Sequence, residues 1–226
     1  MKSEWKMKPF VKSLNSFRII AVGLTGSGKT YFLRKLLSKL QIYKKHRIFV
    51  ADTKYEFDKI KPFTRLSLSH DTFTRKIAKL KIDGTELNNP AHKAGFCCSM
   101  AWNFAPATAY LEEIEEIVDV NAHLPVSHPL IYKVLQQGRA KRACLIVAGQ
   151  MLSRIHKSLI RQSSDIFIFA VKNKEARDIE TILSLEPKSL KFDLPTRKEK
   201  QAGELKDLYS FYHITALEKP IFYKPI

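Results

Sequence analysis

The stretch Gly23-Leu24-Thr25-Gly26-Ser27-Gly28-Lys29-Thr30 decides the fold. A glycine, four residues and then Gly-Lys-Thr form the Walker A pattern, which is the sequence of a loop that binds nucleotide phosphates. The glycines let backbone N–H groups turn inward, and the N-terminus of a following helix adds positive potential. Lys29 at this spacing reaches the terminal phosphates, and the Thr30 hydroxyl is placed to bind Mg²⁺. The stretch therefore predicts a P-loop that binds a nucleoside triphosphate with Mg²⁺.

Strands and helices are predicted to alternate on both sides of this loop. Short β-branched, aromatic and aliphatic runs predict strands that are buried on both faces, at residues 17–22, 47–51, 108–111, 143–148 and 166–171. Apolar residues at helical spacing and end signals predict helices at residues 30–41, 129–138 and 176–185. The alternation predicts an α/β fold with a mostly parallel central sheet covered by helices on both faces.

Two regions depart from this alternation. Residues 58–104 are basic and contain Gly84, Pro90 and Gly95, so they are interpreted as an insertion with a strand near residues 96–102. Residues 186–226 are rich in proline and predict a hairpin between 209–215 and 221–224. We expect a core at residues 1–185 and a C-terminal extension at 186–226 that packs on the same domain.

Hydrolysis requires one carboxylate that holds Mg²⁺ and another that polarises the attacking water. The apolar run at 108–111 ends in Glu112 and Glu113. We assign Glu112 to Mg²⁺, together with Thr30, and Glu113 to the water as general base. The first position is usually Asp, and Glu112 is longer by one methylene group. The alternative is that both residues begin a solvated acidic helix with Glu115 and Glu116.

Three more polar residues are candidates for the same reaction. Gln150 follows the run at 143–148, where an amide can contact the γ-phosphate or the water; a surface glutamine is the alternative. Arg139, directly after Gly138, is the candidate that stabilises charge in the transition state, in its own site or in that of a neighbouring subunit. Arg142 is the rival for this role.

The chain is strongly basic. Its 226 residues include 39 Lys and Arg against 22 Asp and Glu, which gives a net charge of +17. Such self-repulsion is typical of proteins with a polyanionic partner, so nucleic acid is favoured over an anionic lipid surface. The basic clusters are Lys141 and Arg142; Arg154, Lys157 and Arg161; Lys76, Lys79 and Lys81; and Lys188, Lys191, Arg197, Lys198 and Lys200. Any single cluster has an ordinary solvated face as its alternative.

No apolar run approaches the roughly 20 residues that a membrane span requires, and residues 1–14 lack the apolar centre of a signal peptide. We therefore expect a soluble or peripheral protein. Cys97, Cys98 and Cys144 form no Cys-x-x-Cys pair, and the seven histidines lack zinc-site spacing. This pattern indicates a reducing compartment.

Five segments together resemble the FtsK/HerA superfamily of DNA-pumping ATPases: residues 23–30, 52–57 (Asp-Thr-Lys-Tyr-Glu-Phe), 111–113 (Leu-Glu-Glu), 137–139 (Gln-Gly-Arg) and 148–150 (Ala-Gly-Gln). Within that superfamily the chain looks like the genome-packaging ATPases of tailless icosahedral viruses that contain a membrane. The resemblance covers roughly residues 15–175 and thins over the insertion and the tail.

The resemblance implies a RecA-like P-loop fold that hydrolyses ATP with Mg²⁺ and translocates double-stranded DNA into a preformed capsid. It also implies a homo-oligomeric ring, often a hexamer in that family, in which Arg139 completes a neighbour's site. Capsid or portal proteins are the implied partners, at the packaging vertex of a virion or in the host cytoplasm. DNA contacts would be made to phosphates without reading sequence.

Four other functions are compatible with parts of the sequence. A cellular HerA-like translocase or helicase would use the same chemistry. A small P-loop kinase would need an acceptor pocket and suits the basic charge poorly. A GTPase is disfavoured because Asn173-Lys174 is followed by Ala176 where guanine recognition needs Asp. A domain that only binds DNA or a capsid, without catalysis, is the alternative that Glu112 leaves open.

Overall fold

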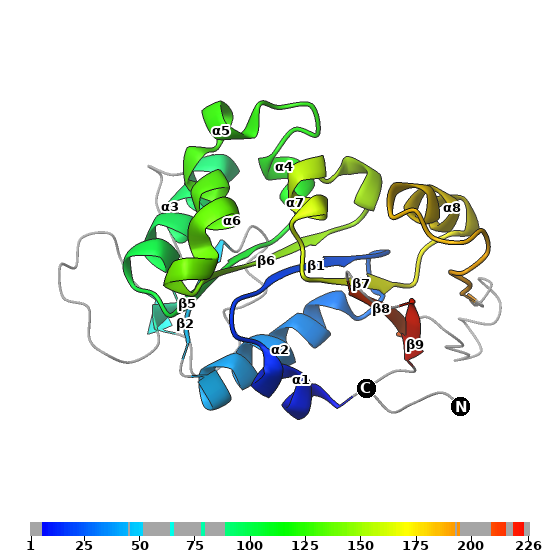
Figure 1. Ribbon diagram of the computed structural model, residues 1–226, viewed down its shortest axis with the longest axis horizontal. Coiled ribbons are helices and arrows are strands. Elements are labelled where there is room, and N and C mark those ends of the chain that lie inside the picture. Colours follow the sequence, from blue (N-terminus) through cyan, green and yellow to red (C-terminus); the bar gives the residue numbers. More distant parts are fainter. Residues whose placement is uncertain are drawn as a thin grey trace.

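One sheet, with β1 at its centre, organises the molecule (Figure 1). The computed structural model describes residues 6–44, 46–51, 64–65, 78–79, 89–192, 194, 209–215 and 219–223. In this part of the chain seven strands pair in the order β2-β5-β6-β1-β7-β8-β9. Their bounds are β1 (Arg18–Val22), β2 (Arg47–Ala51), β5 (Ala107–Leu111), β6 (Ala143–Gly149), β7 (Asp165–Phe169), β8 (Phe211–Thr215) and β9 (Ile221–Tyr223). The pairs among β1, β2, β5, β6 and β7 are parallel, which confirms the expected sheet.

Helices cover both faces of this sheet (Figure 1). On one face lie α1 (Met7–Ser13) and α2 (Lys29–Lys44). On the other lie α3 (Pro90–Asn103), α6 (Pro129–Lys141), α7 (Lys157–Arg161) and α8 (Asn173–Ile182), with the short α4 (Ile114–Ile117), α5 (Leu124–Ser127) and η1 (Leu152–Arg154) between them along the chain. A separate two-residue pair, β3 (Thr64–Arg65) and β4 (Ala78–Lys79), is also parallel. Every helix in the described part of the chain falls short of the length and hydropathy of a membrane span.

The alternation of side chains along each strand divides the core into two layers. In β1, Ile19 and Ala21 pack with α2, whereas Ile20 and Val22 face the layer that contains α3 and α6. Leu33, Leu36, Leu37 and Leu40 give α2 one fully buried stripe. A strand buried on both faces must be apolar at every position, and this is why the continuous apolar runs marked the parallel strands correctly.

The strand predicted near residues 96–102 is wrong, because these residues belong to α3. Asn89 caps this helix by accepting a hydrogen bond from the Ala91 N–H at 2.8 Å, and Pro90 occupies the first turn. Its buried residues are Ala94, Cys97, Cys98, Met100 and Ala101, which follow helical spacing. The helix packs on the sheet and on α6 as part of the core, so at least residues 90–103 are no separate insertion. Residues 52–57 and most of 58–88 lie outside the described residues.

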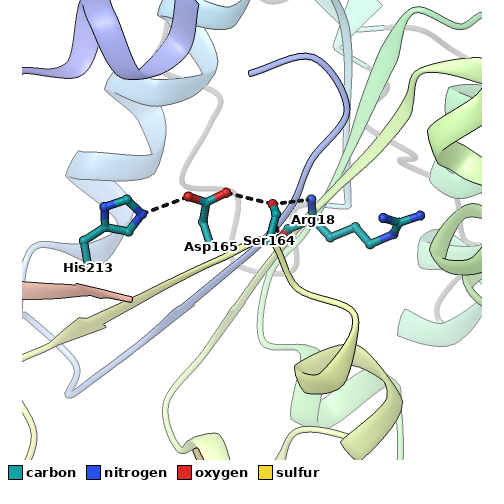
Figure 2. A network of polar contacts seen from close by, with 4 residues as sticks. All are labelled: Arg18, Ser164, Asp165 and His213. Carbon is teal, nitrogen blue, oxygen red and sulfur yellow. Dashed lines mark hydrogen bonds and ion pairs between the residues drawn. The ribbon is translucent and has the colours of Figure 1, made fainter. Parts of the chain in front are cut away.

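The predicted C-terminal hairpin is confirmed: β8 and β9 pair antiparallel, and β8 adds antiparallel to β7. Figure 2 shows the polar row that crosses this junction near the start of β7. His213 Nε2 lies 2.8 Å from Asp165 Oδ1, and Ser164 Oγ donates to Asp165 Oδ2 at 2.7 Å while accepting from the Arg18 N–H at 3.2 Å. The row therefore ties β8 to β1 across β7. The domain boundary at residue 185 stays a prediction.

A buried histidine lies where β2 begins. His46 is 4% exposed, its Nδ1 lies 3.1 Å from Thr108 Oγ1, and its ring stacks on Phe17. Burial, reinforced by the positive charges of Lys44 and Arg142, lowers the pKa of His46 to about 4.

We predict that the chain loses stability in mild acid through His46. The folded state holds a neutral ring down to about pH 4, whereas the unfolded chain binds a proton below about pH 6.5. The free energy of unfolding should therefore fall as the pH drops from about 6.5 to 4, by about 2 kcal/mol at pH 5 from this group. Urea unfolding at a series of pH values measures it.

The matched control compares His46→Gln with His92→Gln, since His92 is exposed on α3. The His46 variant should show a flatter dependence of unfolding free energy on pH than the wild type, and the His92 variant should follow the wild type. An unchanged slope in His46→Gln would contradict the assignment.

Candidate active site

The loop between β1 and α2 curves as the Walker A pattern predicts. Gly28 has φ +89° and Gly26 has φ +77°, in the left-handed region that favours glycine. A Cβ at Gly23 would lie 2.7 Å from Phe169 Cβ, so glycine also lets the loop pass close to the end of β7. The loop then enters α2 at Lys29, which directs the N-terminal N–H groups of that helix toward the loop's concave side.

The Lys29 side chain turns back onto the first residues of the loop. Its ammonium donates to the carbonyl oxygens of Gly23 at 2.7 Å and Leu24 at 3.1 Å. The amine is therefore held against the start of the same loop whose N–H groups would surround a phosphate. A terminal phosphate is a stronger acceptor for this charge than a carbonyl oxygen.

The two acids stand at the end of β5, and both are buried. Glu112 is 5% exposed and Glu113 is 8% exposed. Glu113 has φ +49° and precedes α4, so the chain turns sharply there. The alternative of a solvated acidic helix start does not describe these two residues, although Glu116 in the same turn is exposed.

One cavity of about 310 Å³ brings most of the predicted residues together. Its walls include Lys29 and Thr30 from the loop, Glu112 and Glu113 after β5, and Gln150 after β6. Because β5, β6 and β1 are adjacent parallel strands, their carboxyl ends meet at one edge of the sheet. Sequence patterns at three separate places in the chain therefore predicted residues that share one cavity.

Gln150 contacts the acids in two ways. Its side-chain Nε2 donates to Glu113 Oε1 at 3.4 Å, and its backbone N–H donates to Glu115 Oε1 at 2.5 Å. The register of β5 and β6, with Leu111 opposite Val147, brings Glu113 beside Gly149. The amide is thus held next to the carboxylate that was predicted as general base.

The oxygen atoms in this cavity suit Mg²⁺. Thr30 supplies a hydroxyl and Glu112 a carboxylate, and both line the same cavity. Mg²⁺ commonly takes one or two protein oxygens and completes its shell with water and substrate phosphates. In the described residues no three His, Cys, Asp or Glu side chains gather as a metal site.

Arg139 and Arg142 lie away from this cavity. Both are exposed near the C-terminus of α6, and Arg142 directly precedes β6. The seven residues of β6 separate Arg142 from the cavity edge by about 20 Å at the usual rise of a strand. Arg139 is near Arg18 at the start of β1, where it adds to the effect of burial in lowering the pKa of the Arg18 guanidinium. The structure therefore does not bring either arginine to the chain's own P-loop.

Sequence reasoning missed two tyrosines that border the cavity, Tyr31 and Tyr209. Tyr209 also packs over the loop, because a Cβ at Gly28 would lie 3.1 Å from its Cδ1. The same two tyrosines line a neighbouring cavity of about 320 Å³, whose other walls include Phe32, Lys35, Phe169 and Phe211. The position of Tyr31 directly after the loop could have indicated it. Tyr209 depends on the pairing of β8 with β7, which no local pattern reveals.

Part of the predicted basic surface is described. Arg154, Lys157 and Arg161 are exposed along η1 and α7, the segment that follows Gln150. His156 begins α7 by accepting from the Ser158 N–H, and its Nε2 lies 2.9 Å from the Ala122 carbonyl oxygen. Lys188 and Lys191 are also exposed. Lys76, Lys81, Arg197, Lys198, Lys200 and the side chain of Lys79 lie outside the described residues.

The comparisons with known proteins give a family and a fold. A family model for the central domain of the helicase HerA matches residues 11–220. The genome packaging NTPase B204 from Sulfolobus turreted icosahedral virus 2, in complex with AMP, has a TM-score of 0.67 at 16% identity over 94% of this chain and 100% of that chain. The same NTPase in complex with AMPPCP has a TM-score of 0.65 at 16% identity over 93% and 98%.

A cellular protein shares the fold as well. The cytoplasmic domain of the Type VII secretion ATPase EccC from Thermomonospora curvata has a TM-score of 0.58 at 16% identity, over 92% of this chain and 25% of that chain. At these identities the likeness shows the fold alone. No curated protein sequence matches the chain.

Proposed function

The chain belongs to the family of the HerA central domain and is a P-loop ATPase of the HerA and FtsK type, and from this premise we propose that it translocates double-stranded DNA. More narrowly, we propose that it packages a viral genome into a preformed capsid. The observation that carries the proposal is the single cavity in which the P-loop, two buried carboxylates and Gln150 converge. Support for packaging comes from the fold, which is similar over nearly the whole chain to a protein named as a genome packaging NTPase.

ATP phosphates would lie in the loop, where they replace the carbonyl oxygens as acceptors for Lys29. Glu113 takes the proton of the attacking water, and Gln150 orients that water or the γ-phosphate. Thr30 and Glu112 would hold Mg²⁺, which neutralises charge on the β- and γ-phosphates when bound. Glu112, although longer than the usual aspartate, is buried in the same cavity as Thr30 and suits this role.

The aromatic cavity beside the loop is the place for the nucleobase. Tyr209 borders both cavities, so a nucleotide whose phosphates lie in the loop passes this ring to reach the second cavity. Tyr31, Phe32 and Phe211 make that cavity largely apolar, and flat aromatic walls favour stacking of a base. This arrangement supports a nucleoside triphosphate over inorganic triphosphate as the substrate.

DNA contact is proposed for the exposed cations that follow Gln150. Arg154, Lys157 and Arg161 lie on η1 and α7, directly after the residue that contacts Glu113. A motor must couple its ATPase site to its DNA contacts, because a change around the γ-phosphate must reach the residues that hold DNA. With a net charge of +17 the chain is suited to phosphate contacts that read no sequence.

A ring would explain where Arg139 acts. This side chain is exposed near the amino end of β6, opposite the cavity at the carboxyl end, so a role in hydrolysis would place it at a site on another subunit. We therefore propose a homo-oligomeric ring, a hexamer by analogy with the family, in which Arg139 stabilises charge in the neighbour's site. Capsid or portal proteins would hold this ring at the packaging vertex.

The other candidates differ in what stimulates ATP turnover. A cellular HerA-like translocase shares the chemistry and is favoured by the family match itself. A kinase would turn over ATP in the presence of a small acceptor, and a binding domain without catalysis would not hydrolyse ATP at all.

We predict that double-stranded DNA stimulates ATP hydrolysis by the purified chain. Glu113→Gln preserves size and removes the base, so kcat should fall about 10²- to 10⁴-fold while ATP binding persists. Steady-state ATPase assays with and without DNA, and binding of a fluorescent ATP analogue, measure both effects. Hydrolysis that survives Lys29→Ala would remove the proposal, whereas Lys39→Ala, ten residues along the same helix, should leave activity intact.

We predict that Arg139 acts between subunits. Arg139→Ala should lower kcat by about 10³-fold or more if it stabilises transition-state charge. Mixing Arg139→Ala with Lys29→Ala should restore activity, because some interfaces then combine an intact loop with an intact arginine. The exposed Arg177→Ala on α8 is the control. No recovery in the mixture would contradict a shared site, and recovery only with Arg142→Ala would assign the role to Arg142.

We predict that Tyr209 contributes to binding through the base. Tyr209→Ala should raise the KM for ATP about tenfold, since base stacking on an aromatic ring is worth roughly 1–3 kcal/mol. Tyr209→Phe keeps the ring and should behave as the wild type. Competition by inorganic triphosphate should be similar in all three proteins, and a weakened competition in Tyr209→Ala would show that the ring acts on the phosphate loop instead.

A further inference from the structure

Glu115 lies outside the cavity and yet contacts its edge. This residue is in the first turn of α4, two positions after Glu113. Its Oε1 accepts the Gln150 backbone N–H at 2.5 Å. Its Oε2 is buried and has no hydrogen-bond partner in the described part of the chain.

The Glu115 carboxylate occupies the space in which a side chain at position 149 would lie. A Cβ at position 149 would lie 2.6 Å from Glu115 Oε2, closer than real Cβ contacts allow, and 3.3 Å from Ile155 Cδ1. The backbone of Gly149 is not in the left-handed region, because only Gly23, Gly26 and Gly28 have positive φ among the described glycines. Glycine at position 149 is therefore explained by the space that the Glu115 carboxylate occupies, and not by a turn of the backbone.

The same three residues connect the end of β6 to the predicted base. Glu115 holds Gln150 by its backbone, and Glu113 receives the side chain of Gln150 at 3.4 Å. Since the Gln150 side chain is exposed and its contact with Glu113 is long, the backbone bond is the firmer of the two constraints. Displacing the backbone of Gln150 would move its amide away from Glu113.

We propose that Glu115 is a positioning residue for ATP hydrolysis: through Gly149 and Gln150 it sets the distance between the Gln150 amide and Glu113. The inference rests on the proposed hydrolysis at this cavity. Glu115 touches neither substrate nor Mg²⁺ in this scheme, so it acts on kcat and leaves nucleotide binding unchanged. A displacement of about 1 Å at such a site is enough to cost up to 10²-fold in rate.

The test is a double-mutant cycle at positions 115 and 149. Glu115→Ala removes the acceptor of the hydrogen bond from the Gln150 backbone N–H. Gly149→Ala adds a methyl group where the Glu115 carboxylate lies and so displaces that carboxylate. Each should lower kcat by about 10- to 100-fold with KM changed less than about twofold. The double variant should be no slower than either single variant, because the methyl group no longer meets the carboxylate and the same bond is lost once.

Two further variants separate positioning from folding. Glu115→Gln keeps an oxygen acceptor at the same length and should restore at least half of the wild-type kcat. Glu116→Ala removes an exposed carboxylate from the same turn and should match the wild type. Circular dichroism and thermal melting of every variant check that the fold is retained.

The outcomes are distinct. Three results would each overturn the proposal while leaving the ATPase intact. In the first, the loss of kcat in the double variant equals the product of the two single losses; in the second, Glu115→Ala has the same kcat as Glu116→Ala. In the third, the losses of activity follow the losses in melting temperature. If the wild type does not hydrolyse ATP, or Lys29→Ala is as active as the wild type, the proposed function fails and the positioning role fails with it.

Discussion

Hydrogen bonding of β6 between β5 and β1 is the constraint on which the site depends. The register places Val22 opposite Gly149 and Leu111 opposite Val147, so the three strands end at nearly the same level. The P-loop, the two acids and Gln150 are the first residues beyond those ends. A slip of one residue in either pairing would exchange the faces of that strand and carry these side chains out of the cavity. The hydrogen bonds between the parallel strands, rather than contacts among the polar residues, therefore bring the residues of the candidate active site together.

The backbone of Glu113, just after β5, is locally strained. A non-glycine residue with φ +49° lies in the left-handed region, which costs on the order of 1–2 kcal/mol. The turn ends β5 abruptly and begins α4, which keeps the Glu113 carboxylate at the cavity and sends Glu115 back toward Gln150. Strain of this kind persists only when the surrounding packing enforces it, and it gathers at functional sites. Here the packing is the buried start of α4 at Ile114.

The sequence was sufficient wherever a residue's place follows from its own strand. The five parallel strands are continuous apolar runs, and the loop, the acids and Gln150 directly follow three of them, so their convergence could be predicted. The prediction of a strand near residues 96–102 failed because Gly95 suggested a break in regular structure. The spacing of the buried residues Ala94, Cys97, Cys98 and Ala101 is helical. Tyr209 could not be found, since it reaches the loop only through the antiparallel addition of β8 to β7. The distance of Arg139 from its own cavity likewise follows from the length of β6, which no motif expresses.

The two ends of β6 constrain any assembly that shares its sites. Its carboxyl end carries Gln150 at the cavity, and its amino end follows Arg142 and the last turn of α6 with Arg139. An arginine from one subunit can reach the cavity of another only if opposite ends of β6 face each other, and a head-to-tail contact is one arrangement that achieves this. Such a contact leaves one cavity and one arginine edge unused at each step, so the chain of subunits continues until it closes. A two-fold dimer in which each Arg139 faces the other subunit's cavity would instead complete two sites and stop at two subunits. If Arg139 acts on a neighbour, the opposite ends of β6 must therefore face each other across the interface, and a head-to-tail ring repeats that contact at every interface.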